Sequence, residues 1–249
     1  MTSRINSLNE LQEVKKRQAE LMALRLDSSK KQKIEKREIL VCVGGGCLAS
    51  GALDICKALR ESIAAHKIEN LAVVVETGCM GPCAAGPVAR VMPDNVFYQG
   101  ITPDDAVEII EKHIVEGNLV TRLLHHDSES GRPVAEMDNI GYFKKQTRIA
   151  LERCGTVDPF EINEYIAVDG YQGLAKAITA LKPSDIIETV LASGLRGRGG
   201  GGFPTGLKWK FTAASPETPK NVVCNADEGD PGAFMDRSML EGDPHSIIE

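Results

Sequence analysis

Four cysteines in two closely spaced pairs constrain this chain more than any other feature of its sequence. The pairs are Cys42 with Cys47, with four residues between them, and Cys79 with Cys83, with three residues between them. Each pair follows a short apolar run typical of a buried strand, Ile39–Val43 before the first and Leu71–Glu76 before the second. If these strands are neighbours, both loops lie at one edge of a sheet. The spacing therefore predicts a metal centre held by four thiolates.

Thiolate spacing alone leaves the identity of the metal open. A structural zinc ion tolerates these spacings as well as an iron–sulfur cluster does. The residues around the cysteines are mostly small: Gly44, Gly45, Gly46, Ala49, Gly78, Gly81, Ala84, Ala85 and Gly86. Small residues let backbone N–H groups approach sulfur, and such hydrogen bonds raise the potential of an iron–sulfur cluster. This feature favours the cluster only modestly.

Composition limits the cellular compartments and the classes of partner that fit this chain. The chain has seven cysteines, a net charge of −6 and no secretory leader, which favours a cytoplasmic protein whose cysteines are ligands or core residues. It has neither a basic aromatic stripe nor an apolar run of membrane-spanning length, so we expect no nucleic-acid partner and no direct membrane insertion. Because no Cys-x-x-Cys pair occurs, thiol redox catalysis is disfavoured.

The other three cysteines are expected to be buried small hydrophobic residues. Cys56 falls on the apolar face of a predicted helix, Cys154 in a region expected to be helical, and Cys224 in the strand-like run Asn221–Cys224.

Hydrophobic spacing places the elements around the cysteines. A helix is expected over Leu8–Arg25, and the charged run Lys30–Arg37 is interpreted as a solvated linker. A glycine turn is expected at Gly44–Gly46 and a second helix over Ala52–Ala65. Its apolar face carries Leu53, Cys56, Leu59 and Ile63.

Two more strands and a capped helix complete a β-α-β-β-β-α unit. The strands are expected around Val88–Met92 and Val96–Tyr98. The helix runs from Thr102, its N-cap, through Pro103 to about Val115. Four segments follow from this organisation: an N-terminal helix and charged linker over 1–37, a ferredoxin-like domain over 38–127, a linker over 128–146, and a second domain over 147–249.

A glycine-rich loop is the second functional signal. Gly194–Trp209 is not a Rossmann turn, because no strand precedes it, and it lacks the Gly-Lys-Ser/Thr ending of a P-loop. Consecutive glycines expose N–H groups to an anion, and the segment adds charge and aromatic rings. The charged residues are Arg196, Arg198 and Lys208, and the rings are Phe203 and Trp209. The pattern indicates a site for a phosphate and a planar ring.

An acidic, turn-rich loop follows the run Asn221–Cys224. It carries Asp227, Glu228, Asp230 and Asp236. A calcium loop is disfavoured, because the EF-hand spacing and its final glutamate are missing. A solvated acidic turn remains the alternative.

The cysteine region resembles a known family. Val41–Cys47 followed by a helix, and then Glu76–Pro87 with Gly86-Pro87 after the last cysteine, resemble the thioredoxin-like [2Fe–2S] ferredoxins, which include the 24-kDa-type subunit of respiratory NADH dehydrogenase. The resemblance covers about Glu38–Asp127. It implies that Cys42, Cys47, Cys79 and Cys83 hold a [2Fe–2S] cluster.

The glycine loop and the acidic loop together resemble the FMN- and NADH-binding 51-kDa-type subunit of respiratory NADH dehydrogenase and its relatives in soluble hydrogenases and formate dehydrogenases. The resemblance implies FMN and NAD(H) or NADP(H) as cofactors, with NAD and NADP left equivalent. The implied cofactor-binding residues are Gly197, Arg198, Gly199, Gly200, Phe203, Lys208, Phe211, Asn225, Asp227, Glu228 and Asp230. The implied fold class is α/β, a thioredoxin-like ferredoxin domain followed by the N-terminal part of an α/β FMN/NAD-binding domain.

Two features favour the hydrogenase or formate dehydrogenase branch. Asp230 stands where many respiratory members have glutamate, and both modules lie in one chain, as in the flavin subunits of electron-bifurcating hydrogenases. The implied partners are the other subunits of such a complex, including a catalytic iron–sulfur subunit, with soluble ferredoxin as a further partner. Because only about one turn follows the helix start at Asp243-Pro244, we expect a longer subunit, with further [4Fe–4S] clusters in the missing part or in partner subunits.

The resulting hypothesis is an NAD(P)H-dependent iron–sulfur flavoprotein oxidoreductase, acting as an electron-transfer subunit of a cytoplasmic complex. The alternative is a non-enzymatic interaction module, a thioredoxin-like domain stabilised by zinc or by a cluster.

Overall fold

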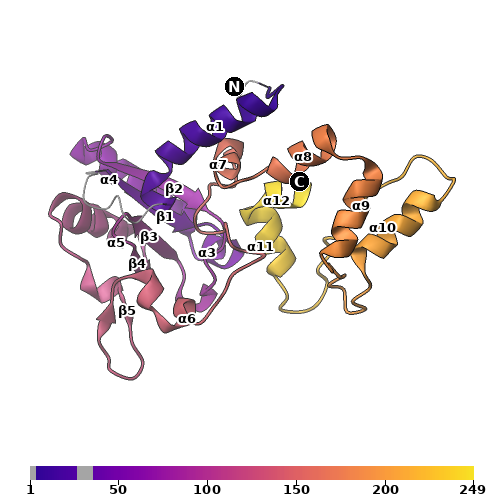
Figure 1. The fold of residues 1–249 in the computed structure, drawn as a ribbon. Coiled ribbons are helices and arrows are strands. Elements are labelled where there is room, and N and C mark those ends of the chain that lie inside the picture. Colours follow the sequence, from indigo (N-terminus) through magenta and orange to yellow (C-terminus); the bar gives the residue numbers. More distant parts are fainter. Residues whose placement is uncertain (1–3, 27–35) are drawn as a thin grey trace. The chain divides into compact units, whose positions relative to one another are not determined.

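The computed structural model describes residues 4–26 and 36–249 (Figure 1). Its helices and strands are α1 Leu8–Leu21, α2 Ala23–Leu26, β1 Arg37–Cys42, α3 Gly45–Ala49, α4 Ala52–His66, β2 Ala72–Thr77, η2 Cys83–Ala85, β3 Val88–Met92, β4 Val96–Gln99, α5 Pro103–Glu108, η3 Ile109–Val115, η4 Thr121–Leu123, β5 His125–His126, β6 Pro133–Val134, η5 Met137–Asn139, α6 Gly141–Lys144, α7 Ile162–Ala167, α8 Gln172–Ala180, α9 Pro183–Ala192, α10 Thr205–Ala214, α11 Met235–Gly242 and α12 Pro244–Ile248. In the two described ranges, none of the helices has the length and apolar character needed to cross a bilayer.

The chain divides into two units. The first comprises Met1–Gly170 together with Glu228–Ile248, and the second comprises Tyr171–Asp227 with Glu249.

A four-stranded mixed sheet organises the first unit. The strand order is β2-β1-β3-β4, with β1 parallel to β2 and antiparallel to β3, and β3 antiparallel to β4. The predicted β-α-β-β-β-α order is confirmed. The parallel register aligns Cys42, the last residue of β1, with Thr77, the last residue of β2. Both cysteine loops therefore leave the same edge of the sheet.

The two faces of the sheet are covered by different segments. Ile39 and Val41 of β1 face the core that contains α4, α5 and η3, whereas Leu40 and Cys42 face the opposite core. That second core includes Met137 and Ile140, in the region that the sequence suggested was a linker. Alternation along β1 thus places Cys42 on the face that residues 137–143 cover.

Local signals account for several elements. Thr102 caps α5, with its side chain accepting a hydrogen bond from the backbone N–H of Asp105, whose carboxylate accepts one in return. The helix expected over Leu8–Arg25 is present but is interrupted at Met22 between α1 and α2. Apart from Lys36 and Arg37, the charged run Lys30–Arg37 lies outside the described residues.

Three expectations were wrong in detail. Leu53 is 55% exposed, because Ile55 occupies the buried face of α4 beside Cys56. The glycine turn begins at Gly44, but Gly45 and Gly46 already belong to the short helix α3. The linker expected over 128–146 is partly structured, since β6 within it pairs with β5 to form a hairpin.

The N-terminal helices pack against the segment that precedes Gly170. Met22 is fully buried and clusters with Val157 and Ala167. Arg25 forms buried ion pairs with Glu38 of β1 and Glu164 of α7, with nitrogen–oxygen distances of 2.7 Å to each. This charge triad connects three segments that are far apart in the sequence.

The second unit consists of helices and loops with little buried surface. None of the residues of α8 or α9 is buried, and in α10 only Gly206 is buried. Helix α9 is capped at its start, where the N–H of Lys182 donates to the carboxylate of Asp185. The strand expected at Asn221–Cys224 does not form, and Cys224 is exposed. In the described part of this unit no strand is available to pair with it, and a lone strand is unstable.

Candidate metal centre and cofactor loop

The two cysteine loops meet at the edge of the sheet where β1 and β2 end. Cys42 is the last residue of β1, Cys47 lies in α3, Cys79 follows β2, and Cys83 begins η2. Cys42, Cys47 and Cys79 are buried, whereas Cys83 is exposed. The predicted convergence of the two pairs is therefore present in the fold.

The four thiols form a row of neighbours. Cys83 hydrogen-bonds Cys79, Cys79 hydrogen-bonds Cys42, and Cys42 hydrogen-bonds Cys47. The hydrogen bond to Cys47 raises the pKa of Cys42 to about 11 and lowers the pKa of Cys47. The hydrogen bond to Cys42, together with burial, raises the pKa of Cys79, and burial raises the pKa of Cys83. Binding of a metal would displace these protons, because thiolates are the ligands.

The row of sulfurs bears on the choice between metals. In the described ranges, no three His, Cys, Asp or Glu side chains are grouped so that they could hold one metal ion. A tetrahedral zinc site needs its ligands around a single centre, whereas a two-iron cluster takes two thiolates at each iron. The row of thiols gives Cys42 and Cys47 as one neighbouring pair and Cys79 and Cys83 as the other, which fits two thiolates at each iron.

Glycines make room around the sulfurs. A Cβ atom on Gly86 would lie 2.9 Å from the Cys47 sulfur, and one on Gly44 would lie 2.8 Å from the Cys79 Cβ and 3.4 Å from its sulfur. On Gly46 it would lie 3.6 Å from the Cys83 sulfur. The small residues that the sequence showed around the cysteines thus leave space that side chains would fill.

Each of the four sulfurs accepts a hydrogen bond from a backbone N–H group. The donors are Met80 to Cys42, Val88 to Cys47 and Gly81 to Cys79, and the Cys83 sulfur accepts from its own backbone N–H. Each hydrogen bond lowers the pKa of the thiol that accepts it. Such N–H donors offset the negative charge of thiolate ligands and of a bound cluster, so the site fits an anionic iron–sulfur centre.

Three contacts at this site carried no signal in the sequence. Arg148 donates a hydrogen bond of 3.1 Å to the backbone carbonyl of Cys79. The hydroxyl of Tyr142 lies 2.9 Å from where a Cβ on Gly81 would be, and a Cβ on Gly78 would lie 2.5 Å from the Cα of Gly242 in α11. These partners are distant in sequence, so local patterns do not reveal them.

Replacing Gly86 with alanine is expected to damage the cysteine site. The backbone φ of Gly86 is −71°, which alanine adopts easily, so the change tests the lost space alone. The added Cβ would meet the Cys47 sulfur at 2.9 Å and the Cys83 carbonyl at 3.2 Å. Overpacking of this kind costs about 1–3 kcal/mol. We expect lower iron and sulfide content and a lower free energy of unfolding, measured by metal analysis and denaturant titration.

Gly141→Ala is the matched control, because no atom lies within 4 Å of the Cβ that it would add. Its metal content should equal that of the unaltered chain. If Gly86→Ala also leaves both quantities unchanged, the space at Gly86 has no role in the site.

The glycine loop of the second unit is closed at its base. The N–H of Gly197 donates to the carbonyl of Phe203 at 2.9 Å, and the N–H of Thr205 donates to Leu195 at 2.9 Å. Gly200 has a φ of +99°, a conformation that glycine adopts readily and other residues rarely do. No atom lies within 4 Å of a Cβ built on Gly199, Gly200 or Gly201, so the tip of the loop is open.

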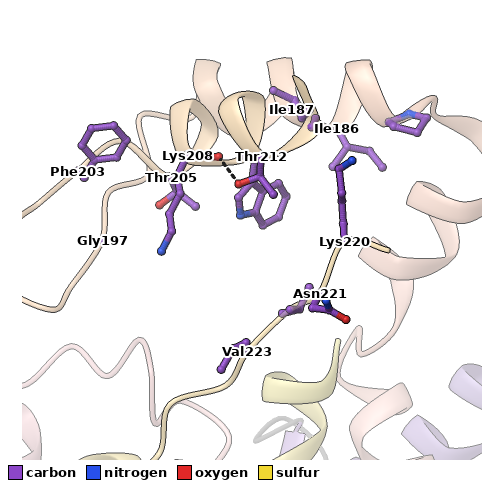
Figure 2. A pocket seen from close by; sticks show the side chains of 14 residues that line it. Ile186, Ile187, Gly197, Phe203, Thr205, Lys208, Thr212, Lys220, Asn221 and Val223 are labelled. Atoms are coloured by element: carbon purple, nitrogen blue, oxygen red, sulfur yellow. Dashed lines mark hydrogen bonds between the residues drawn. The ribbon is translucent and has the colours of Figure 1, made fainter. Parts of the chain in front are cut away.

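A cavity of about 810 Å³ lies beside this loop, between α9, α10 and residues 220–223. Figure 2 shows Lys208 reaching from α10 into this space, with Phe203 at one side and Val223 opposite. Gly197 also lines the cavity. Its volume is within the range of cofactor and ligand pockets, and its lining is mostly apolar with two lysines, Lys208 and Lys220. The Lys220 ammonium donates to the carbonyls of Ser215 and Glu217.

Only part of the predicted cofactor set is gathered at the cavity. Gly197, Phe203 and Lys208 line it, and Arg198, Gly199 and Gly200 belong to the adjoining loop. Phe211 is 63% exposed and is not among the lining residues. Asn225 and Asp227 are exposed, and the Asn225 side chain accepts a hydrogen bond from the N–H of Asp227. Glu228 and Asp230 belong to the first unit.

Glu228 has a structural role within the first unit. Its carboxylate accepts hydrogen bonds from the N–H groups of Asp236 at 2.8 Å and Arg237 at 3.0 Å, at the start of α11. These bonds hold the pKa of Glu228 below its usual range. Asp230 accepts a backbone hydrogen bond from Ala233 through its carbonyl. Contact of either residue with a cofactor stays a prediction.

Comparison with known families agrees with both signals. Residues 3–113 match the thioredoxin-like [2Fe–2S] ferredoxins, and residues 190–249 match the Nuo51 FMN-binding domain. The chain thus has one segment that is similar to each of these two families. Its ferredoxin segment contains all four paired cysteines, and its FMN-binding segment contains the glycine loop, Lys208 and the acidic loop. The predicted α/β fold class, a thioredoxin-like ferredoxin domain followed by part of an FMN-binding domain, is confirmed.

Individual relatives point in the same direction. The chain is 57% identical over 106 residues to the NADP-reducing hydrogenase subunit HndC of Solidesulfovibrio fructosivorans. The matched region covers 43% of this chain and 21% of that protein. It is 46% identical over 101 residues to an NADH-quinone oxidoreductase subunit of Rhizobium meliloti, covering 41% of this chain and 24% of the relative. This chain thus spans about a fifth to a quarter of the length of these curated relatives. Both relatives are subunits of larger enzymes.

Among solved structures, the thioredoxin-like [2Fe–2S] ferredoxin from Aquifex aeolicus is 35% identical. The match covers 36% of this chain and 95% of the ferredoxin, with a TM-score of 0.34.

Proposed function

We propose that this chain is part of an electron-transfer subunit in an NAD(P)-linked iron–sulfur flavoprotein complex. The observation that carries the proposal is the combination, in one chain, of four cysteines at one sheet edge with a closed glycine loop beside a cavity that Lys208 of α10 lines. The two family matches fall on these same two features. An interaction module without redox function would need neither the glycine loop nor the ammonium group beside it.

In this proposal the thiolates of Cys42, Cys47, Cys79 and Cys83 hold a [2Fe–2S] cluster. The N–H groups of Met80, Gly81 and Val88 stabilise its negative charge. The pairwise arrangement of the sulfurs and the space that glycines leave beside them support this role.

We assign FMN to the glycine loop. Exposed N–H groups between Gly197 and Phe203 would face the flavin phosphate, and Lys208 would add its charge. When bound, FMN supplies the exchange between two-electron transfer with NAD(P)H and one-electron transfer with iron–sulfur centres. The remaining predicted contacts belong to the same proposal: Arg198, Gly199, Gly200, Phe203, Phe211, Asn225, Asp227, Glu228 and Asp230.

The identity to an NADP-reducing hydrogenase subunit supports a hydrogenase as the parent enzyme, ahead of a formate dehydrogenase. A catalytic iron–sulfur subunit would then be a partner, with soluble ferredoxin as a second one if the complex bifurcates electrons. The module boundaries near Asp127 and residue 147 are part of the proposal. The described cysteines are free thiols, which fits the cytoplasm as its compartment.

Replacing Lys208 with alanine tests the flavin assignment in the complex purified with this chain. A hydrogen bond from a charged group contributes about 1.5–3 kcal/mol. Its loss should weaken FMN binding about 10- to 100-fold by the usual relation between free energy and affinity. We expect lower flavin content and slower NAD(P)H-dependent dye reduction, while the electron paramagnetic resonance (EPR) signal of the cluster persists.

Lys210→Ala is the matched control on the same helix. Lys210 pairs with Glu188 at 3.4 Å and does not line the cavity. The control should retain its flavin. Equal flavin content in both variants and in the unaltered complex would mean that the glycine loop and Lys208 do not form the FMN site.

A further inference from the structure

Arg148 lies beside the second cysteine loop and is not one of the metal ligands. Its guanidinium donates a hydrogen bond of 3.1 Å to the carbonyl of Cys79 and is partly buried. Within the described ranges, no carboxylate lies at ion-pair distance from Arg148, although ten other lysines and arginines of these ranges form such pairs. Its positive charge is therefore not neutralised by a neighbouring side chain.

The segment around Arg148 is held in place by three contacts, two of them with this loop. The Tyr142 hydroxyl lies against Gly81, and the Phe143 ring packs edge-on against Phe97 of β4 with centroids 5.2 Å apart. Arg148 makes the third contact, at Cys79. Residues 142–148 thus run beside the Cys79–Cys83 loop, and the charge of Arg148 has a defined place near it.

Charge at this position affects the two redox states of an iron–sulfur centre differently. One-electron reduction adds one negative charge to a centre that its four thiolates already make anionic. A nearby cation stabilises the reduced state more than the oxidised state, and partial burial limits screening by solvent. Removal of the cation should therefore make the centre harder to reduce.

We propose that Arg148 is a positioning residue that raises the reduction potential of the iron–sulfur centre. This inference rests on the proposed function, because it requires the cluster. Arg148 holds the Cys79 loop through the carbonyl hydrogen bond and stabilises the added electron through its charge. It thereby sets how readily the centre accepts one electron from a donor.

The test is a reductive titration with dithionite, followed by the EPR signal of the cluster. Arg148→Gln and Arg148→Met remove the charge, and Arg148→Lys keeps it. At a fixed potential the neutral variants should show an about tenfold lower ratio of reduced to oxidised cluster, which is a 59 mV lower midpoint for a one-electron couple. Arg148→Lys should stay within about twofold of the unaltered protein, that is, within about a third of that shift.

Arg237→Gln is the control, because Arg237 is a second arginine near the cysteines. Its guanidinium carbon lies 3.2 Å from where a Cβ on Gly45 would be, but Arg237 is exposed and pairs with Glu241 at 2.8 Å. Solvent and the Glu241 carboxylate should screen the charge of Arg237. The reduction potential of the cluster in Arg237→Gln should therefore match that of the unaltered protein.

The outcomes separate this inference from the proposed function. If the unaltered chain binds no iron and sulfide, the proposed function fails. If it binds the cluster, and a neutral variant that also binds it has the unaltered midpoint, the inference about Arg148 is overturned. Should one neutral variant lose the cluster, the other is used. An equal shift in Arg148→Lys and in the neutral variants would also overturn it, because the charge would then have no part in the effect.

Discussion

Replacing Cys79 with serine is expected to abolish the iron–sulfur centre. Cys79 occupies the middle of the row of thiols, with hydrogen bonds to both Cys42 and Cys83. It is buried, so no solvent ligand can readily take its place. A serine hydroxyl is a poor ligand for iron compared with a thiolate. Iron and sulfide content and the visible absorption of the cluster should fall to a small fraction of those of the unaltered chain.

Two other buried cysteines provide controls for this loss. Cys154 is 1% exposed and donates a weak hydrogen bond to the carbonyl of Ser238 at 3.8 Å, which a serine hydroxyl could also make. Cys56 lies in the core between α4 and the sheet. Both serine variants should keep the cluster spectrum and lose only stability. An intact cluster in Cys79→Ser, or its loss in Cys154→Ser, would show that the ligand set has been misassigned.

Replacing Arg25 with alanine is expected to cause a large loss of stability. Its side chain is 4% exposed and pairs with Glu38 and Glu164, which are 7% and 8% exposed. It also donates to the carbonyl of Thr156 at 2.8 Å. The change leaves two carboxylates buried without their cation, and breaking a buried pair in this way costs about 3–5 kcal/mol. The free energy of unfolding from denaturant titration should fall by that amount.

An exposed pair gives the matched comparison. Arg60 pairs with Glu76 at 2.8 Å, but its side chain is 52% exposed. Arg60→Ala should lower the free energy of unfolding by about 0–1 kcal/mol. If Arg25→Ala costs no more than Arg60→Ala, the triad does not connect the N-terminal helices to the sheet.

Sequence patterns predicted the features that depend on local chemistry. The cap at Thr102, the strands before the cysteine pairs and the convergence of Cys42 with Cys79 all follow from the order of residues along the chain. The parallel pairing of two strands then places both loops at one edge without further information. The same reasoning located the glycine loop, because its base closes through neighbouring residues such as Gly197 and Phe203.

Features set by distant partners could not be predicted in this way. Arg148 reaches Cys79 across 69 positions, and Arg25 reaches Glu164 across 139. In the sequence alone, each of these arginines is indistinguishable from a surface charge. Strand propensity misled the prediction at Cys224, because a strand forms only where another strand can pair with it. Leu53 was placed on the wrong face, because its apolar spacing fitted α4 as well as that of Ile55.

The central claim is that the four paired cysteines hold a two-iron cluster. Metal and sulfide analysis of the 249-residue chain, purified without oxygen, tests it most directly, together with an EPR spectrum after reduction. We expect about two irons and two sulfides per chain and a signal of spin one-half from the reduced cluster. Stoichiometric zinc without sulfide would contradict the account.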